Sequence, residues 1–252
     1  MSRWFIRLSF KGTAYAGWQK QENANTVQNE LEKALAVLLR QPIATTGCGR
    51  TDTGVHAREF FVHFDWPSHE FPHSISTFVK SLNGILPFDI AVQDIFEVSE
   101  ESHARFSAVS RTYEYLIAPV KSPFMQGLAS IIHSVPDPEV LNTSVSALLG
   151  RHDFTSFSKQ NTQVKTNFCH VTHANWSLRD GLMVFTITSD RFLHGMVRAI
   201  VGTCLQRYSH DQLIDILNAK DRSVAGPAAP PEGLYLIHIQ YPFLDHKLHE
   251  SA

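Results

Sequence analysis

Residues 47–57 carry the side chains of this chain that are best suited to chemistry. Asp52 stands among three glycines, Arg50 precedes it by two positions, and no apolar run covers the carboxylate. Glycine allows a tight loop and a close approach of the backbone to a ligand, so we predict that the loop presents Asp52 as a catalytic carboxylate. Because aspartate is also common in turns, the loop taken alone fits a solvated surface turn at least as well. The rest of the chain has to decide between these two readings.

This loop has to be compared with two known kinds of motif, namely glycine-rich nucleotide-binding loops and the Asp-Thr-Gly triplet of aspartic proteases. Its glycines match neither GxGxxG nor a phosphate loop ending in GK[ST], so the sequence predicts no nucleotide cradle. Asp52-Thr53-Gly54 is the triplet of aspartic proteases, but it occurs once, and two such aspartates must share a proton. Arg50 would oppose that state, because a nearby cation favours the ionised carboxylate. An aspartic protease acting as a dimer is a distant alternative.

Cysteine and histidine lead us to predict no metal. The three cysteines, Cys48, Cys169 and Cys204, form no CxxC pair, and their odd number argues against a disulfide framework. Residues 169–173 read Cys-His-Val-Thr-His, but a regular strand would place Cys169 and His173 on one face and His170 on the other. A zinc site needs three or four suitably spaced ligands, which this segment does not supply.

Composition indicates an ordinary globular protein. The 252 residues are 43% hydrophobic and 18% charged, and no apolar run approaches the ~20 residues that span a bilayer. The first residues show no signal-peptide pattern, so with the unpaired cysteines we predict a cytoplasmic protein without membrane contact. The net charge of −2 counts mildly against nucleic-acid binding, yet residues 151–207 carry seven basic and three acidic residues. Chance clustering on a solvated surface explains that stretch equally well.

The elements that must position Asp52 alternate between strands and helices. Apolar residues recur with period two in the expected strands and at helical spacing in the expected helices. The predicted strands are 4–10, 60–64, 90–96, 111–118, 170–178, 182–188 and 234–241, and the predicted helices are 27–38, 75–82, 138–150, 192–207 and 210–219. Asn25 or Thr26 can cap the first helix, and Arg179-Asp180-Gly181 indicates a hairpin turn. This order predicts an α+β protein of two halves, 1–104 and 105–242, with a loose tail over 243–252.

A series of blocks along the chain resembles the tRNA pseudouridine synthase A family. The first blocks are Gly12-Thr13-x-Tyr15-x-Gly17-Trp18-Gln19-x-Gln21, Thr26-Val27-Gln28, Gly49-Arg50-Thr51-Asp52-x-Gly54-Val55-His56-Ala57, and Asn83 with Leu86-Pro87-x-Asp89-Ile90. The later blocks are Ala104-Arg105-Phe106, Arg111-Thr112-Tyr113-Glu114-Tyr115, Gly150-x-His152-Asp153-Phe154, Phe192-Leu193-x-x-Met196-Val197-Arg198 with Val201-Gly202, and Pro231-x-Gly233-Leu234-Tyr235-Leu236. They follow the family order from residue 10 to about 241, and this order makes the resemblance specific.

The resemblance implies a fold and an activity. The fold would be two ferredoxin-like (RRM-like) halves forming a mainly antiparallel sheet with helices on one side. The activity would be isomerisation of uridine to pseudouridine at positions 38, 39 and 40 of the tRNA anticodon arm, in which the base leaves C1′ through N1 and rejoins it through C5. This reaction involves no redox change or hydrolysis, so no cofactor is expected. Family members are generally homodimers whose cleft holds the tRNA, and the basic stretch could line that cleft.

The resemblance also assigns roles to five residues. Asp52 would be the catalytic nucleophile or base, and Arg198 would pair with it and keep it ionised. Tyr113 would stack on the extruded base, where stacking contributes ~1–3 kcal/mol. Arg50 would help to displace the base or steady the backbone. Leu234 would form the apolar floor of the pocket, although a core leucine fits this position equally well.

Two departures and one alternative accompany the resemblance. Thr53 stands where the family usually has Ala, which creates the protease-like triplet, and Lys11 stands where Asp is common. We expect a loop to tolerate the hydroxyl of Thr53, whereas any role of the acid at position 11 is in doubt. The alternative function is an RNA-binding protein on the same scaffold that has lost catalysis. The joint presence of Asp52, Tyr113 and Arg198 favours the enzyme, because a binding module needs no such set.

Overall fold

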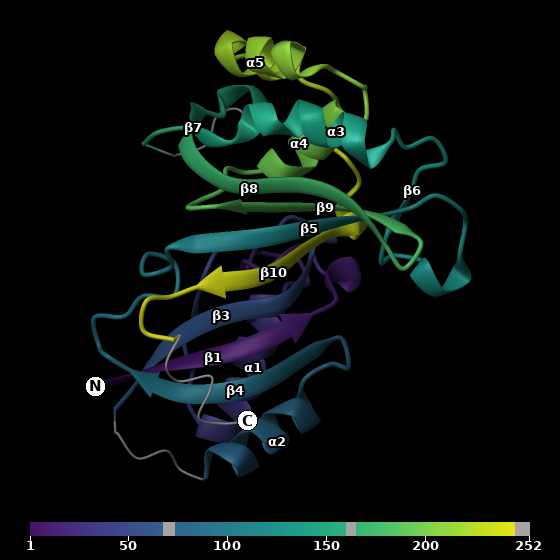
Figure 1. Cartoon of the computed structure of the whole chain (residues 1–252). Helices are drawn as coiled ribbons and strands as arrows, with labels where there is room; N and C mark the ends of the chain where they lie inside the picture. Colours follow the sequence, from purple (N-terminus) through teal and green to yellow (C-terminus); the bar gives the residue numbers. More distant parts are fainter. Residues whose placement is uncertain (68–73, 160–164, 245–252) are drawn as a thin grey trace. The chain divides into compact units, whose positions relative to one another are not determined.

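A computed structural model of the chain describes residues 1–67, 74–159 and 165–244 (Figure 1). Two compact units are present: Met1–Val109 together with the segment from Leu236 onward, and Ser110–Tyr235. The predicted halves, 1–104 and 105–242, differ in that the segment from Leu236 belongs to the first unit. The predicted tail, 243–252, lies outside the described residues from position 245.

The first unit is built on an antiparallel sheet. Its strands are β1 (Ser2–Phe10), β2 (Thr46–Gly47), β3 (His56–Trp66) and β4 (Ile90–Val98), and residues 236–240 of β10 (Leu234–Gln240) belong to the same unit. Strand β1 pairs antiparallel with β3, Ile6 opposite Val62, and on its other side with β4, Ile6 opposite Ile95. The short β2 pairs antiparallel with β3, so the order β4-β1-β3-β2 is the ferredoxin-like arrangement of a split βαβ unit.

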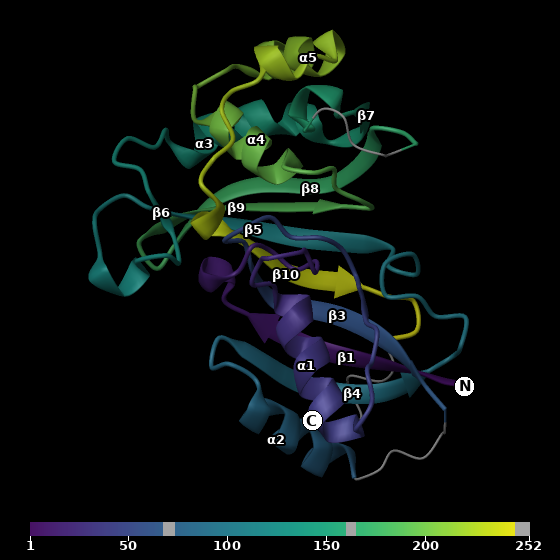
Figure 2. The ribbon, with the colours of Figure 1, turned by 180° about the vertical axis from the view of Figure 1, so that it is seen from behind.

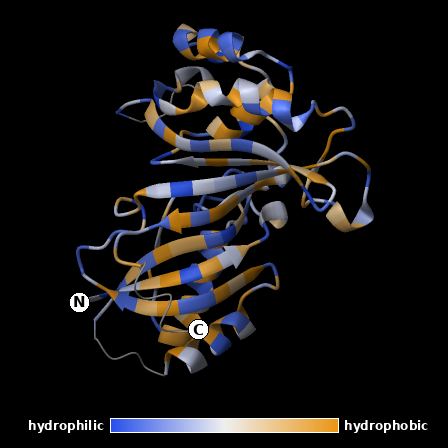
Figure 3. Ribbon diagram, in the orientation of Figure 1, coloured by the Kyte–Doolittle hydropathy of each residue, from blue (hydrophilic) through white to orange (hydrophobic). Residues whose placement is uncertain are grey.

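Two helices complete this unit. Helix α1 (Val27–Leu39) begins where the sequence predicts, because the side chain of Thr26 accepts a hydrogen bond from the backbone N–H of Asn29. Its apolar stripe is buried. In Figure 1 the strands of this unit lie in front of α1, and in Figure 2, seen from behind, α1 lies in front of the strands. Helix α2 (Ile75–Ile85) follows, capped by Ser74. Figure 3 shows hydrophobic residues interrupted by polar ones along the strands, as period-two burial requires.

Residues 236–241 pack into the first unit. The backbone N–H of Ile239 donates to Glu59, a carboxylate only 6% exposed, over 2.9 Å. The ring of Tyr241 lies edge-on to Phe5 and Phe61, at centroid distances of 5.6 and 5.2 Å, and its hydroxyl donates to the Ala104 carbonyl. Residues 236–241 therefore form part of the core that supports β1 and β3.

The second unit contains a further set of paired strands. Its strands are β5 (Ser110–Ala118), β6 (Ser130–Ile131), β7 (Gly150–Asp153), β8 (Phe168–Arg179) and β9 (Leu182–Ser189). Their order is β5-β9-β8-β7 with antiparallel neighbours, and β6 adds a short parallel pairing to β5. Asp180 and Gly181 join β8 to β9 in the hairpin turn that the sequence predicts, and their φ values of 53° and 76° are typical of type I′. The α+β class with a mainly antiparallel sheet is thereby confirmed.

The helices of the second unit are α3 (Pro138–Val145), α4 (Met196–Cys204) and α5 (His210–Ala219). Helices α3 and α4 are shorter than the sequence predicts, whereas α5 has the predicted bounds. Helix α4 begins four residues later than the predicted start at Phe192, because Gly195 adopts a left-handed conformation with φ of 73°. Helix α3 begins as predicted at Asp137-Pro138 but ends at Val145, where a 3₁₀ turn replaces it. Within the described ranges, no helix has the length and apolar character needed to cross a membrane.

Candidate active site

The loop that carries Asp52 connects β2 to β3. A turn forms where the backbone N–H of Val55 donates to the Asp52 carbonyl at 3.2 Å, and Gly54 within this turn has a φ of 79°. Gly54 also donates to the Tyr15 carbonyl at 3.2 Å, which ties the loop to the first block of the sequence. Asp52 is half-buried, and Arg50 and Thr53 are exposed. Arg50 precedes this turn by two residues in the same loop.

Two glycines hold this loop by close approach. A Cβ at Gly17, which has a φ of 94°, would lie 2.2 Å from the Thr51 carbonyl oxygen. A Cβ at Gly12 would lie 2.0 Å from the Val55 carbonyl oxygen. No side chain fits at either position, so the backbone of residues 12–17 rests directly against the loop on both sides of Asp52. In the sequence these glycines are recognisable only as part of a motif, because their contacts with residues 51 and 55 depend on the fold.

Buried side chains fix the remaining geometry of the loop. The backbone N–H of Gly12 donates at 3.0 Å to Nδ1 of His56, which is 1% exposed, so this nitrogen acts as an acceptor and carries no proton. Below the loop Trp18 lies 4.4 Å from Phe60, ring centroid to centroid. A Cβ at Gly47 would lie 2.5 Å from the Trp18 indole nitrogen, so this glycine is also required. The residues at the start of the loop, at Gly47, therefore pack against aromatic rings.

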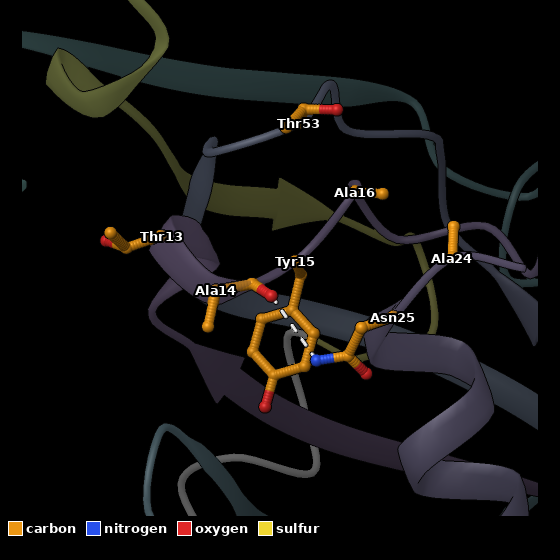
Figure 4. A pocket seen from close by; sticks show the side chains of 7 residues that line it. All are labelled: Thr13, Ala14, Tyr15, Ala16, Ala24, Asn25 and Thr53. Carbon is orange, nitrogen blue, oxygen red and sulfur yellow. Dashed lines mark hydrogen bonds between the residues drawn. The ribbon is translucent and has the colours of Figure 1, made fainter.

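A hollow of 290 Å³ opens beside the loop (Figure 4). Its lining residues are uncharged: Thr13, Ala14, Tyr15, Ala16, Ala24, Asn25 and Thr53. The amide of Asn25 donates to the Ala14 carbonyl at 3.3 Å, and the Tyr15 hydroxyl donates to Asp89 at 2.5 Å. Burial, followed by the bond to Asp89, raises the pKa of Tyr15, so this phenol stays neutral. Thr53, the residue after Asp52, contributes a hydroxyl group to this hollow, and Asn25 contributes an amide.

Tyr113 lies on β5 of the second unit. It is half-buried, its backbone stands opposite Ile187 of β9, and its ring meets Phe192 edge-on at 5.0 Å and 82°. Phe192 belongs to the loop before α4, and the left-handed Gly195 sets the course of that loop into the helix. The ring of Tyr113 is therefore oriented by an aromatic contact within its own unit.

Arg198 lies on α4 and is half-buried among apolar neighbours. Its Nε donates to the carbonyl of Ala229 at 2.7 Å, and its own carbonyl accepts from the Ala229 N–H at 2.9 Å. The expected need for a partner is thus met in part by a backbone carbonyl. Leu234 opens β10 and is 6% exposed, which suits a core leucine and an apolar pocket floor alike.

The predicted site residues fall on both units. Arg50 and Asp52 belong to the first, and Tyr113, Arg198 and Leu234 belong to the second. The pairing of Asp52 with Arg198 stays a prediction.

One expectation about β8 is wrong. Cys169 is buried, but His173 is exposed and does not share its face, because the pairing with β9 shifts register between Val171 and His173. Burial raises the pKa of the Cys169 thiol to about 12, so this cysteine is a protonated core residue at neutral pH. The described part of the chain contains no group of three His, Cys, Asp or Glu side chains placed to hold a metal ion.

Comparison with known proteins places the chain in a family. A family model described as tRNA pseudouridine synthase matches residues 145–242. Proteins named tRNA pseudouridine synthase A from Parabacteroides distasonis and Porphyromonas gingivalis are each 46% identical, over 247 and 249 residues. These alignments cover 96% of this chain and 97% and 98% of the relatives. The chain belongs to the tRNA pseudouridine synthase A family.

The same family name recurs in a further relative. The protein from Bacteroides thetaiotaomicron is 42% identical over 249 residues, which are 96% of this chain and 91% of that protein. Pseudouridine synthases are isomerases, so the chain belongs to an isomerase family. The family resemblance drawn from the sequence blocks is confirmed.

Proposed function

We propose that this protein isomerises uridine to pseudouridine in tRNA, at positions 38, 39 and 40 of the anticodon arm. Family membership supports the reaction, and the observation that carries the site assignment is the glycine-bounded turn that holds Asp52 between Gly12 and Gly17. A backbone fixed this closely leaves the carboxylate little freedom to move. Such preorganisation is what a nucleophile or base needs, because orientation supplies much of the rate enhancement.

Asp52 is the nucleophile or base of the proposed reaction. A base inside a stacked arm is not accessible, so it must first leave the stack, at a cost of a few kcal/mol. Stacking on Tyr113 offsets that cost by ~1–3 kcal/mol, and Phe192 holds the ring for it. Leu234 supplies apolar surface beneath the base, and Arg50, exposed in the same loop as Asp52, steadies the RNA strand.

Arg198 is the proposed partner of Asp52. A guanidinium can donate two parallel hydrogen bonds to a carboxylate, so this pair would fix the direction in which the Asp52 carboxylate points. The uridine and the product are isomers, and the reaction therefore requires neither an oxidant nor a water molecule. For that reason the proposal includes no cofactor.

The RNA partner is recognised through charge outside the catalytic loop. The chain as a whole is slightly acidic, so phosphate contacts have to come from local clusters such as the basic residues of 151–207. A homodimer would bring two copies of these clusters to one RNA. We propose a cytoplasmic homodimer acting on the anticodon arm, and binding that weakens steeply as salt rises is the expected signature.

An anticodon stem-loop with uridine at position 39 tests the proposal. Wild type is expected to form pseudouridine, and Asp52→Asn, which keeps the shape but removes the charge, is expected to form none. Thr53→Ala serves as the neighbouring control, because Thr53 is exposed and its change leaves the turn intact. Binding without product from wild type would instead indicate an RNA-binding protein on this scaffold. Equal product from wild type and Asp52→Asn would refute the role of Asp52.

A further inference from the structure

Residues 226–230, here called the 226–230 segment, are docked on helix α4. The backbone N–H of Gly226 donates to Oγ1 of Thr203 at 2.9 Å. A Cβ at Gly202 would lie 1.7 Å from the Pro227 carbonyl oxygen, so helix and segment touch backbone to backbone. At the next turn of the helix Ala229 makes the two hydrogen bonds to Arg198 described above. The segment is therefore the support against which the Arg198 side chain is placed.

Tyr115 anchors the far end of this segment. Its hydroxyl donates to the Pro230 carbonyl at 2.8 Å and lies 2.6 Å from Oγ of Ser130. Because a phenol has a single hydrogen, Ser130 is the donor in the second bond. Tyr115 and Ser130 are 0% and 1% exposed, and burial raises the pKa of the phenol, so its proton stays in place at any physiological pH. The carbonyl of Pro230 thus has a fixed, permanent donor.

The ring of Tyr115 reaches the start of β10 as well. A Cβ at Gly233 would lie 2.7 Å from Cζ of Tyr115 and 2.8 Å from the Leu116 carbonyl oxygen, so Gly233 lies directly on the ring. Gly233 precedes Leu234, the proposed pocket floor. Tyr115 also follows Tyr113 by two residues on β5, which places both side chains on the same face of the strand. Tyr115 therefore contacts Pro230, which follows the Ala229 bonded to Arg198, and Gly233, which precedes Leu234.

We infer that Tyr115 is a positioning residue for the reaction. Its hydroxyl fixes Pro230, Pro230 fixes the neighbouring Ala229 carbonyl, and that carbonyl sets the plane of the Arg198 guanidinium through Nε. The inference rests on the proposed function, in which Arg198 pairs with Asp52. The hydrogen bonds from a planar guanidinium to a carboxylate are directional. A small tilt of the guanidinium plane therefore weakens this pair more than a similar movement of a lysine ammonium group would.

Tyr115→Phe tests the inference, and Tyr235→Phe is its matched control. Both substitutions delete one buried tyrosine hydroxyl that donates to a backbone carbonyl of the same unit, because Tyr235 is 7% exposed and donates to Leu128 at 2.6 Å. We expect Tyr115→Phe to lower kcat roughly tenfold with KM nearly unchanged, since misplacement of a catalytic group slows the chemical step. Tyr235→Phe is expected to leave kcat within about twofold, as a hydroxyl that positions no proposed catalytic group affects stability alone.

A double-mutant cycle separates positioning from general damage. In an Arg198→Lys background the guanidinium plane no longer exists, so Tyr115→Phe is expected to reduce kcat by less than about twofold further. Hydrogen exchange at the Ala229 amide, which donates to Arg198, is expected to accelerate in Tyr115→Phe and to stay unchanged in Tyr235→Phe.

Two results would overturn the inference. One is an equal loss of kcat in the two tyrosine variants, and the other is an undiminished effect of Tyr115→Phe in the Arg198→Lys background. Failure of the proposed function looks different: wild type would form no pseudouridine, or Arg198→Lys would be fully active. Even then the exchange rate at Ala229 decides whether Tyr115 holds the segment, and an unchanged rate would reject the structural step.

Discussion

Replacing Gly17 by alanine is expected to disable the catalytic loop without touching a catalytic side chain. Gly17 has a φ of 94°, and its new Cβ would lie 2.2 Å from the Thr51 carbonyl oxygen and 3.2 Å from the Asp52 carbonyl carbon. A left-handed alanine costs about 1–2 kcal/mol. The overlap adds about 1–3 kcal/mol of overpacking, because the chain must shift by roughly 1 Å. We therefore expect Gly17→Ala to lower the free energy of unfolding by about 2–5 kcal/mol.

The same shift reaches the chemistry. A displacement of about 1 Å at the residue before Asp52 is expected to lower kcat roughly 100-fold. Two other glycines provide controls. Gly181→Ala, at a φ of 76° with nothing within 4 Å of its Cβ, carries the backbone cost alone. Gly49→Ala changes the catalytic loop itself, also with nothing within 4 Å, and we expect it to be tolerated.

The assay combines urea unfolding with pseudouridine formation on the stem-loop. Gly17→Ala is expected to fall below Gly181→Ala in stability and far below Gly49→Ala in kcat. If Gly17→Ala were no less stable than Gly181→Ala and kept wild-type kcat, the close approach would not position the loop. The argument for a preorganised Asp52 would then be refuted.

Three further perturbations have expected outcomes. Burial, with Arg3 nearby, lowers the pKa of His63 from 6.5 to about 4, so its neutral ring stabilises the fold above pH 6.5. Stability is expected to decline as pH falls from 6.5 to about 4, and urea unfolding across that range measures it; a flat profile would contradict the prediction. Arg179→Met leaves the Glu114 carboxylate, 5% exposed, without its bidentate partner. We expect the free energy of unfolding, measured by chemical denaturation, to fall by about 1–3 kcal/mol in this variant and to stay unchanged in Arg151→Met. Thr53→Ala is expected to keep kcat/KM within about threefold, since the side chain is exposed; a larger loss would give the hydroxyl a role in RNA binding.

Much of the fold could be predicted because its signals are local. The cap at Thr26, the turn at Asp180-Gly181 and the alternation along β1 each depend on a few neighbouring residues. Strand β2, two residues long, gives no periodic pattern to detect. The start of α4 was misplaced because the sequence does not show that Gly195 is left-handed. The register shift in β8 was missed for the same reason, since a bulge depends on the partner strand.

In the candidate site, too, the features that depend on neighbouring residues could be predicted, and those that depend on residues distant in sequence could not. The Asp52 loop could be recognised from its glycines, since they lie within eight positions of one another in the chain. The support of Gly17 against Thr51, and of Ala229 against Arg198, could not. In both cases the partner is a backbone carbonyl distant in sequence, and every residue type presents the same carbonyl. Only the folded chain shows which one is used.

The route of the last strand sets the order in which this protein can be completed. The core around Phe5 and Phe61 includes Tyr241, and the buried Glu59 is bonded by the N–H of Ile239. During synthesis the first hundred residues emerge well before these partners, so the core of the unit that carries the catalytic loop cannot close until residues 239–241 have been made. Until then this apolar surface is uncovered and exposed to aggregation and proteolysis. The unit that holds Asp52 therefore begins first and is completed last.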